Sequence, residues 1–516
     1  MYAWERMNME IFFNPLSVAV VGASNNRFNL ASTICGLLKS TGYDGAVVAV
    51  NPKGEDVHGC PGYRSVGEIP HDVDLAVILV QASSVPDVVR QCGEKGIRRL
   101  VIESAGFAEN GEEGRRIQEN IDTIAERYGI RYLGPNCLGT LSTGRAFCCF
   151  FGVWPDSPLM EIMRRPGAVS YVIQSGGLAG LVMESLLSDV VGINKVACIG
   201  NKADIDEGDL VTYFEGDGTE VIGMYLENVH RGRKFFQAAS CAVKPLLVYK
   251  AGSTKEGVRA VSSHTAGMAN NDVIFDRACA QAGIIRLRSI VELYSLPKIF
   301  VTMPPLKGKN VAVFTNSGAF GGISADFVAE NGLSMVRLSP ETKKKLRKAG
   351  HLFNADNPVD LGPGLSKQSY LDIYEILLSA PEVDGLLPIP SIWQDFIIDS
   401  LVDLLDICRA YNKPAAIYVP SAVKKIVAIR EEHRLPLFES PEEAVRALAV
   451  SLNHFQNVAE KTSRRLSVTE MPDDSKSGAG ARVRPIVPEN EKSAGGKERV
   501  RLAAEEAVPY TERNAK

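Results

Sequence analysis

Apolar runs alternate with helical stretches along the first part of the chain, and this alternation constrains the fold more than any other feature. Four runs of strand length lie at 17–21, 46–50, 74–80 and 98–103, and the helical stretches lie at 31–39, 85–95 and 112–128. Such runs are typical of strands buried on both faces. Strand–helix alternation predicts right-handed βαβ units in a parallel sheet. A ligand site is therefore expected at the carboxyl ends of these strands.

The alternation continues in two further series. The second has strands at 168–173, 195–199, 221–226 and 245–250, and the third has strands at 310–315, 385–389 and 415–419 before a helix at 441–452. Residues 310–318 repeat the strand, polar residue and Ser-Gly pattern of 168–176, which indicates distant repeats. No histidine or carboxylate group follows Ser317 as it follows Ser175, so we interpret Gly318–Gly322 as a helix start without chemistry.

The domain prediction follows from these series and from a change in composition near residue 461. The 516 residues suit several domains. From Lys461 onward apolar residues become sparse, and such a segment buries too little to offset its ordering entropy. We predict α/β domains at 1–145, 146–303 and 304–460 and a disordered tail at 461–516.

Composition excludes several classes of protein. A formal net charge of −4 gives no electrostatic reason to bind nucleic acid or an anionic membrane. The ten cysteines are scattered without a C-x-x-C pair, so neither a metal site nor a disulfide scaffold is indicated. Residues 1–13 carry charges unlike a signal peptide, and no apolar run reaches the ~20 residues of a membrane helix. The sequence predicts a soluble cytoplasmic protein with reduced thiols.

The first domain carries an incomplete dinucleotide-binding pattern. Gly22-Ala23-Ser24 begins like the usual glycine turn but stops short of G-x-G-x-x-G. After the second strand, Asn51-Pro52-Lys53 places a lysine where a nicotinamide enzyme has an acid for the ribose. A cation there suits a ribose phosphate. Coenzyme A fits, a phosphorylated nicotinamide cofactor fits nearly as well, and a solvated turn lysine is the third interpretation.

Small residues also follow the later strands of this domain. Ser104-Ala105-Gly106-Phe107 and Gly134-Pro135-Asn136-Cys137 are loops that either admit a ligand to the backbone or form simple tight turns. The candidate cofactor contacts are the strand-end residues Gly22, Ala23, Ser24, Asn51, Pro52, Lys53, Val80, Ala105, Gly106 and Asn136.

The second domain carries a candidate phosphate site. Ser175-Gly176-Gly177 follows a strand and opens a helix, and a helix start offers free N–H groups and a positive end to an anion. An ordinary turn with a serine cap explains the pattern equally well. Glu227 follows the 221–226 strand, so it is expected on the same edge of the sheet.

A histidine among hydroxyl residues completes the candidate site. His264 lies in the segment 262–269 beside Ser263 and Thr265, which we interpret as a loop. Neutral imidazole can accept a phosphoryl group, and a carboxylate such as Glu227 could fix its tautomer. The candidate catalytic residues are therefore His264 and Glu227, with phosphate contacts from Ser175, Gly176, Gly177, Ser263 and Thr265. A solvated surface histidine is the alternative.

Taken in order, these motifs resemble those of the α subunit of nucleoside-diphosphate-forming acyl-CoA synthetases. The type is acetate–CoA ligase (ADP-forming), related to the succinyl-CoA synthetase α subunit. The resemblance covers about residues 10 to 455. Besides the motifs above it includes Gln174-Ser175-Gly176, Gly200-Asn201-Lys202-Ala203-Asp204, Tyr225-Leu226-Glu227, Ser263-His264-Thr265 and Asn357-Pro358-Val359-Asp360-Leu361.

The resemblance implies a fold and a reaction. The fold is an N-terminal Rossmann-like CoA-binding domain followed by two flavodoxin-like parallel α/β domains. The reaction interconverts acyl-CoA, ADP and phosphate with a carboxylic acid, CoA and ATP, through transient phosphorylation of His264 held by Glu227. The chain has no G-x-x-x-x-G-K-[ST] loop, so the nucleotide is expected on a separate partner. The resemblance implies that this partner is an ATP-grasp β subunit that binds ADP or ATP with Mg²⁺.

The chain departs from the family pattern at three places. Phe28-Asn29-Leu30 replaces a Lys–Gly pair, Thr265-Ala266-Gly267 exchanges small residues after the histidine, and Phe147–Arg165 is longer and more apolar than expected. CoA affinity and acid specificity are the properties that these changes put in question. A non-catalytic CoA-binding or sensing protein and an NADP oxidoreductase are the rival functions.

Overall fold

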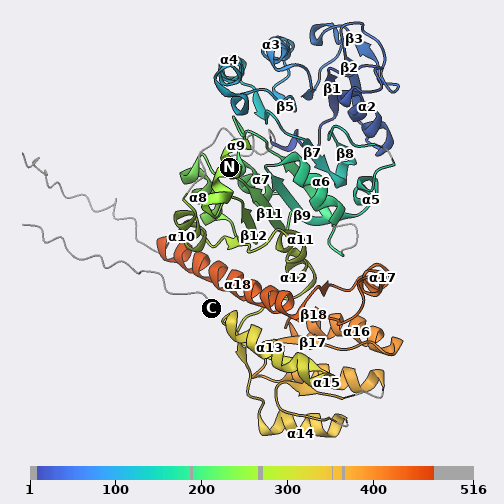
Figure 1. Ribbon diagram of the computed structural model, residues 1–516, viewed down its shortest axis with the longest axis vertical. Helices are drawn as coiled ribbons and strands as arrows, with labels where there is room; N and C mark the ends of the chain where they lie inside the picture. Colours follow the sequence, from blue (N-terminus) through green and yellow to red (C-terminus); the bar gives the residue numbers. More distant parts are fainter. Residues whose placement is uncertain are drawn as a thin grey trace, which may run out of the picture. The chain divides into compact units, whose positions relative to one another are not determined.

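The computed structural model describes residues 9–154, 156–185, 190–264, 271–350, 352–362 and 366–469, whose elements can be followed in Figure 1. They form three α/β domains, which we call the first, second and third layers, and each is built on a sheet with a parallel centre. In the described residues no helix is both long and apolar enough to span a bilayer.

The first sheet is parallel throughout, with the order β3-β2-β1-β4-β5-β6. This is the doubly wound Rossmann order, and its topological switch point lies between β1 and β4. Its strands are β1 (Ser17–Val21), β2 (Ala46–Val50), β3 (Gly62–Tyr63), β4 (Leu75–Ile78), β5 (Arg99–Ile102) and β6 (Arg131–Leu133). Its main helices are α2 (Leu30–Ser40), α3 (Val85–Lys95) and α4 (Gly111–Tyr128).

The second sheet has the order β13-β12-β11-β9-β10-β7-β8. Its five parallel strands follow the flavodoxin-like order, so the switch point lies between β9 and β11. The strands are β7 (Gly139–Ser142), β8 (Phe147–Cys148), β9 (Pro166–Ile173), β10 (Ile193–Cys198), β11 (Val221–Leu226), β12 (Leu246–Lys250) and β13 (Ile285–Arg286). The helices are α5 (Leu159–Met163), α6 (Gly176–Ser185), α7 (Glu207–Glu215), α8 (Gly232–Cys241), α9 (Lys255–His264), α10 (Asp272–Ala282), α11 (Val291–Ser295) and α12 (Pro297–Thr302).

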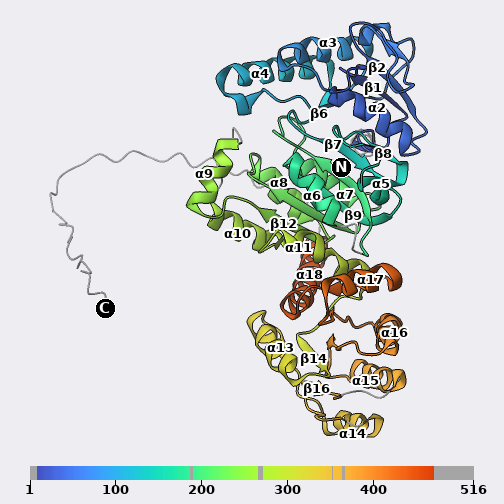
Figure 2. The ribbon, with the colours of Figure 1, turned by 45° about the vertical axis from the view of Figure 1, so that its right-hand side comes forward.

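The third layer repeats this arrangement. β14 (Asn310–Thr315) pairs with β15 (Ser334–Met335) and β16 (Val359–Asp360) along one edge and with β17 (Gly385–Ile389) along the other. β18 (Ile417–Tyr418) and β19 (Leu437–Phe438) continue the series. Figure 2 shows α13 (Gly318–Glu330) on one side of β14, and α15 (Lys367–Ser379) and α16 (Asp395–Tyr411) on the other. The remaining helices are α14 (Pro340–Ala349), α17 (Val423–His433) and α18 (Pro441–Thr469).

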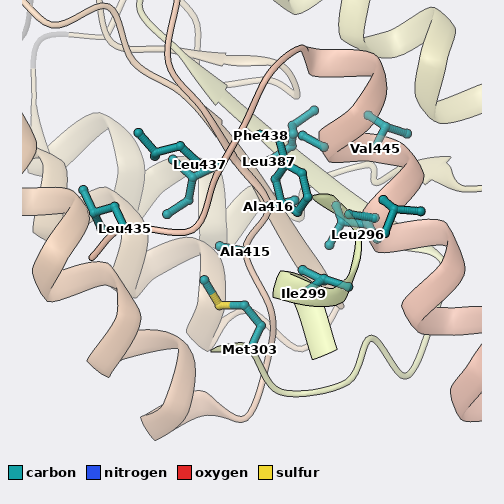
Figure 3. Close-up of a cluster of buried hydrophobic side chains, with 14 of the residues drawn as sticks. Leu296, Ile299, Met303, Leu387, Ala415, Ala416, Leu435, Leu437, Phe438 and Val445 are labelled. Carbon is teal, nitrogen blue, oxygen red and sulfur yellow. The ribbon is translucent and has the colours of Figure 1, made fainter. Parts of the chain in front are cut away.

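One apolar cluster joins the second and third layers. Leu296, Ile299 and Met303, in and after the α11–α12 connection, belong to the same buried cluster as Leu387 of β17 and Val445 of α18. Figure 3 shows these side chains gathered between the connection and the third sheet. Each large aliphatic side chain buried in this cluster stabilises the fold by about 1.5–3 kcal/mol, so the cluster holds the two layers together.

The predicted α/β fold class is confirmed, with two local differences. β7 pairs antiparallel with β10 of the second sheet and β8 pairs antiparallel with β7, although the sequence analysis placed 139–145 in the first domain. α18 continues past the predicted boundary at Lys461 to Thr469, and the disordered tail stays a prediction. Lys461 donates from Nζ to the carbonyls of Ala239 and Ala242, which stabilises this part of the helix. Residues 470–516 lie outside the described residues.

Candidate functional site

The switch point of the second sheet brings a helix start and a carboxylate together. Gln174 follows β9, and its Oε1 accepts from the backbone N–H of Glu227 at 2.8 Å and of Asn228 at 3.4 Å, just after β11. The Gln174 N–H donates to Tyr225 O at 3.0 Å. These bonds lock the strand ends in register, so Glu227 lies beside the first turn of α6.

The first turn of α6 has the small residues that an anion site requires. Ser175 and Gly176 are half-buried and Gly177 is exposed. A Cβ added at Gly176 would be in ordinary contact with Leu138 Cβ at 3.4 Å, and one added at Gly177 would meet open space. Backbone N–H groups at a helix start attract anions. The three residues predicted from the sequence are thus placed on the rim shared with Glu227.

Glu227 is half-buried and accepts from Tyr225 OH at 3.4 Å. Burial, followed by the charge of Glu227, raises the pKa of Tyr225, so this hydroxyl stays protonated as a donor. Tyr225 stacks on Tyr249 with ring centroids 6.1 Å apart, which restrains the donor. The carboxylate is therefore held by its own strand.

A buried ion pair supports the same rim. The Lys202 and Glu207 side chains are each 1% exposed, with Nζ and Oε2 3.0 Å apart. Lys202 Nζ also donates to Asn228 O at 2.6 Å. Neither residue was selected as a site residue from the sequence, although Lys202 stands in the Gly200–Asp204 motif. The signal that could have identified Lys202 was its position after a strand, within a motif that contains glycine.

His264 is the last residue of α9, so 262–264 are helical where the sequence analysis expected a loop. The prediction for Thr265 lies outside the described residues, and the side chains of Ser263 and His264 are not described. The backbone of α9 follows β12, whose carboxyl end is next to that of β11.

The first-domain turn needs glycine at position 22. Gly22 has φ +102°, and a Cβ there would lie 2.3 Å from Leu79 O. Asn29 Nδ2 donates to Gly22 O at 2.9 Å, while its Oδ1 accepts from Ser24 N at 3.2 Å and caps α2 through Ser32 N at 2.8 Å. Asn29, a departure from the family pattern, therefore organises the turn that contains the buried Ala23.

The turn after β2 is organised by Asn51 rather than by the lysine. Asn51 Oδ1 accepts from Lys53 N and Glu55 N at 3.2 and 3.1 Å. Pro52 is exposed. The Lys53 side chain is 77% exposed and lies 3.6 Å from Glu55 Oε1. This geometry leaves both the ribose-phosphate and the solvated-turn interpretations of Lys53 open.

The remaining candidate residues lie on loops that meet at the junction of the two sheets. Val80 N donates to Ser104 Oγ at 3.0 Å, and Gly106 has φ +105° beside the exposed Ala105. Asn136 has φ +57°, and its N–H donates to Ser104 O at 2.9 Å. The structure thus brings the loops of β4, β5 and β6 together.

Glu103 is a buried carboxyl that sequence reasoning missed. It follows β5 and is 3% exposed, and within the described residues neither oxygen has a hydrogen-bond partner. Burial raises the pKa of Glu103 well above its usual range. A Cβ at Gly139 would lie 2.7 Å from Glu103 Oε1, so glycine there makes room for the carboxyl. A carboxyl group with a raised pKa therefore lies where the two sheets meet.

Comparison with known proteins agrees with this architecture. Residues 16–143 match a CoA binding domain, and residues 166–300 match a succinyl-CoA ligase like flavodoxin domain. The α subunit of acetate–CoA ligase (ADP-forming) I of Pyrococcus furiosus is 33% identical over 457 residues, which cover 86% of this chain and 97% of that subunit. The match to acetate–CoA ligase (ADP-forming) I of Archaeoglobus fulgidus has 34% identity and covers 88% of this chain but 64% of that longer protein.

A solved structure gives the same result. The dinucleotide-forming acetyl-coenzyme A synthetase 1 of Candidatus Korarchaeum cryptofilum, in complex with phosphate and ADP, superposes with a TM-score of 0.81 at 30% identity. The superposition covers 89% of this chain and 99% of that one. The chain therefore belongs to the family of ADP-forming acetate–CoA ligase α subunits.

Proposed function

We propose that this α subunit carries a phosphoryl group on His264 while it interconverts an acyl-CoA with a free carboxylic acid. Phosphate attacks the thioester carbon, the CoA sulfur leaves and takes up a proton, and an acyl phosphate forms. A nitrogen of His264 then attacks phosphorus, and the carboxylate leaves. Phosphohistidine finally transfers the phosphoryl group to ADP.

The observation that carries this proposal is the pairing of α6 with Glu227 at the switch point. The side-chain oxygen of Gln174 accepts from the Glu227 N–H at 2.8 Å. A helix start that can bind an anion and a carboxylate that can orient an imidazole therefore share one rim. The helix that ends at His264 starts from the neighbouring strand. Ser263 and Thr265 flank the histidine in sequence and would donate to phosphate.

The first domain would hold CoA at the switch point between β1 and β4. The close approach of Gly22 to Leu79 O leaves no room for a side chain, which suits a backbone that lies against a pyrophosphate. Ala23, Ser24, Asn51, Pro52, Val80, Ala105, Gly106 and Asn136 would surround the cofactor. Lys53 would exchange Glu55 for the 3′-phosphate.

The nucleotide would bind on a partner. This chain corresponds to an α subunit, and the Archaeoglobus relative carries additional sequence on the same polypeptide. We assign ADP or ATP with Mg²⁺ to an ATP-grasp β subunit, and a small carboxylic acid to the site beside α6. The complex would bury an interface above ~1,200 Å², the usual size of a stable one.

The deciding experiment is phosphorylation of the chain by γ-³²P-ATP in the presence of its ATP-grasp partner. We expect an acid-labile, base-stable label that disappears in His264→Asn. The matched control is His58→Asn, because His58 is exposed and lies in the first domain. A label that persists in His264→Asn would refute the proposal.

The rival sensing function is tested in the same mixture. A sensor would bind CoA without any phosphorylation of the chain. CoA, dephospho-CoA and NADP are compared by calorimetry: we expect binding of CoA, weaker binding of dephospho-CoA, and none of NADP. Equal affinity for the first two would remove Lys53 from the site.

A further inference from the structure

Glu109, which is not among the site residues assigned above, connects the first and second domains through its carboxylate. It lies in a short 3₁₀ turn between β5 and α4. Its Oε1 accepts from the backbone N–H groups of Gly106 and Phe107 at 2.7 and 3.2 Å. Its Oε2 accepts from Asn201 Nδ2 at 2.6 Å. One oxygen therefore fixes the loop after β5, and the other reaches the second domain.

Asn201 belongs to the loop that follows β10 and is equally well held. Its N–H donates to Pro135 O at 2.9 Å, and its Oδ1 accepts from Asn136 Nδ2 at 3.5 Å. Its Nδ2 also reaches Gln118 Oε1 at 3.4 Å. The amide of Asn201 thus connects the loops after β5, β6 and β10.

This contact is separate from the one that fastens the domains. Arg131 and Asp204 form an ion pair at 2.8 Å, and Asp204 also accepts from Tyr132 N at 2.8 Å. Because that pair bridges the same two layers without touching the Gly106 loop, loss of Glu109 leaves the domains joined. The effect of Glu109 falls on the position of one loop.

We propose that Glu109 and Asn201 are a positioning pair that sets the Gly106 loop against the rim of the second sheet, so that the CoA sulfur is delivered to the acyl phosphate. The inference rests on the proposed function, because it assumes CoA on that loop. Hydrogen bonds to a charged acceptor are about twice as strong as bonds between neutral groups. Such strength suits a contact that fixes the distance between two loops. A displacement of ~1 Å costs roughly 10²-fold in rate.

The test exchanges donor and acceptor across the junction. Glu109→Gln keeps an oxygen for Gly106 but turns an N–H toward Asn201, so two donors oppose each other. Adding Asn201→Asp places an acceptor opposite that N–H and restores the bond in reverse. We expect kcat for acyl-CoA formation to fall roughly 10–100-fold in Glu109→Gln and to return to within about threefold of wild type in the double variant.

Two assays separate positioning from folding. ATP–ADP exchange with the partner uses phosphohistidine without CoA, so it should stay within about twofold in Glu109→Gln, as should both activities in the exposed control Glu113→Gln. Equal loss of exchange and acyl-CoA formation, or no recovery in the double variant, would overturn the positioning pair. Exchange that fails in the wild-type complex would instead refute the proposed phosphohistidine.

Discussion

The second and third sheets present the same motif at the same place. Gln174-Ser175-Gly176 begins α6 after β9, and Asn316-Ser317-Gly318 begins α13 after β14. Each amide side chain bonds to the loop that follows the neighbouring strand of its sheet. Asn316 Oδ1 accepts from Ser391 N after β17 at 2.8 Å, and Gln174 Oε1 accepts from Glu227 N after β11. The backbone device is common to both repeats.

The two rims differ in their ionisable groups. The second rim has Glu227, and the buried Lys202–Glu207 pair contacts it through the bond from Lys202 to Asn228 O. At the third rim Ser391 replaces the glutamate, and Asn316 Nδ2 donates to the neutral Tyr370 OH at 3.1 Å. Buried charges lower the stability of the fold. Their presence at one of two equivalent rims indicates that this rim is the functional one. The fold supplies the helix start in both cases, whereas function depends on these side chains.

One carboxylate does lie at the third rim, on the opposite side of the helix start. A Cβ at Gly318 would lie 3.8 Å from Asp360 Oδ2. A carboxylate there competes with any anion for the positive end of α13. In the second sheet the acids of the loop after β10 have other partners: Asp204 pairs with Arg131, and Asp206 caps α7.

The largest expected effect tests the two equivalent positions. Glu227→Gln should slow phosphorylation of the chain by roughly 10²–10⁴-fold, because the charge that orients and stabilises the imidazole is lost. Ser391→Ala should change the rate by less than about twofold, as a neutral surface change does. Both rates are measured by ³²P transfer from ATP with the partner present. A comparable loss in both variants would break the contrast between the rims.

The next test concerns the cost of buried charge. Lys202→Met leaves Glu207 buried without a cation and should destabilise the protein by about 3–5 kcal/mol. The matched control is Lys367→Met in the third layer, whose pair with Asp403 at 2.7 Å is 39% and 43% exposed. An exposed pair contributes at most about 1 kcal/mol. Urea unfolding of both variants compares them, and equal midpoints would contradict the asymmetry.

The smallest effect is a dependence on pH. Glu103 binds its proton more tightly in the folded chain than at its ordinary pKa of 4.5, so its contribution to stability is lost as pH rises above that value. Glu103→Gln should therefore gain stability relative to wild type as pH increases from 5 to 8. Thr315→Val, which removes the 3.1 Å bond to Ile389 O at the third rim, should lose about 1 kcal/mol at every pH.

These pH series are read from thermal unfolding at pH 5, 6.5 and 8. A Glu103→Gln difference from wild type that stays constant over this range would show that the native carboxyl titrates normally. A Thr315→Val difference that varied with pH would mean that the third rim also contains a coupled ionisable group.

Local pattern predicted the elements and the rim well. The helix at 85–95 and the strand at 221–226 have the bounds expected from their residues, because apolar periodicity and glycine stops are short-range signals. Glu227 and Ser175 came from strand ends alone. Parallel strand ends predicted that they share one rim, and β9 and β11 are indeed parallel neighbours in the sheet.

The sequence did not predict what depends on contacts between distant segments. β7 and β8 are short, and β7 pairs with β10 some fifty residues away, so neither has a pattern of its own. The Glu109–Asn201 bond spans 92 positions. The second half of α18 is polar and depends on the carbonyls that Lys461 contacts. The position of the His264 side chain stays a prediction.

The return of α18 to the second layer limits how these domains can be exchanged. Besides the Lys461 contacts, Arg446 donates to Arg286 O at 3.0 Å and lies 3.5 Å from Glu292. A hybrid that joined the first two domains of this chain to the third domain of a relative would bring that relative's counterpart of α18 to those carbonyls. A hybrid of this chain therefore has to keep α18 together with the second domain that it contacts, although the third domain separates the two along the sequence.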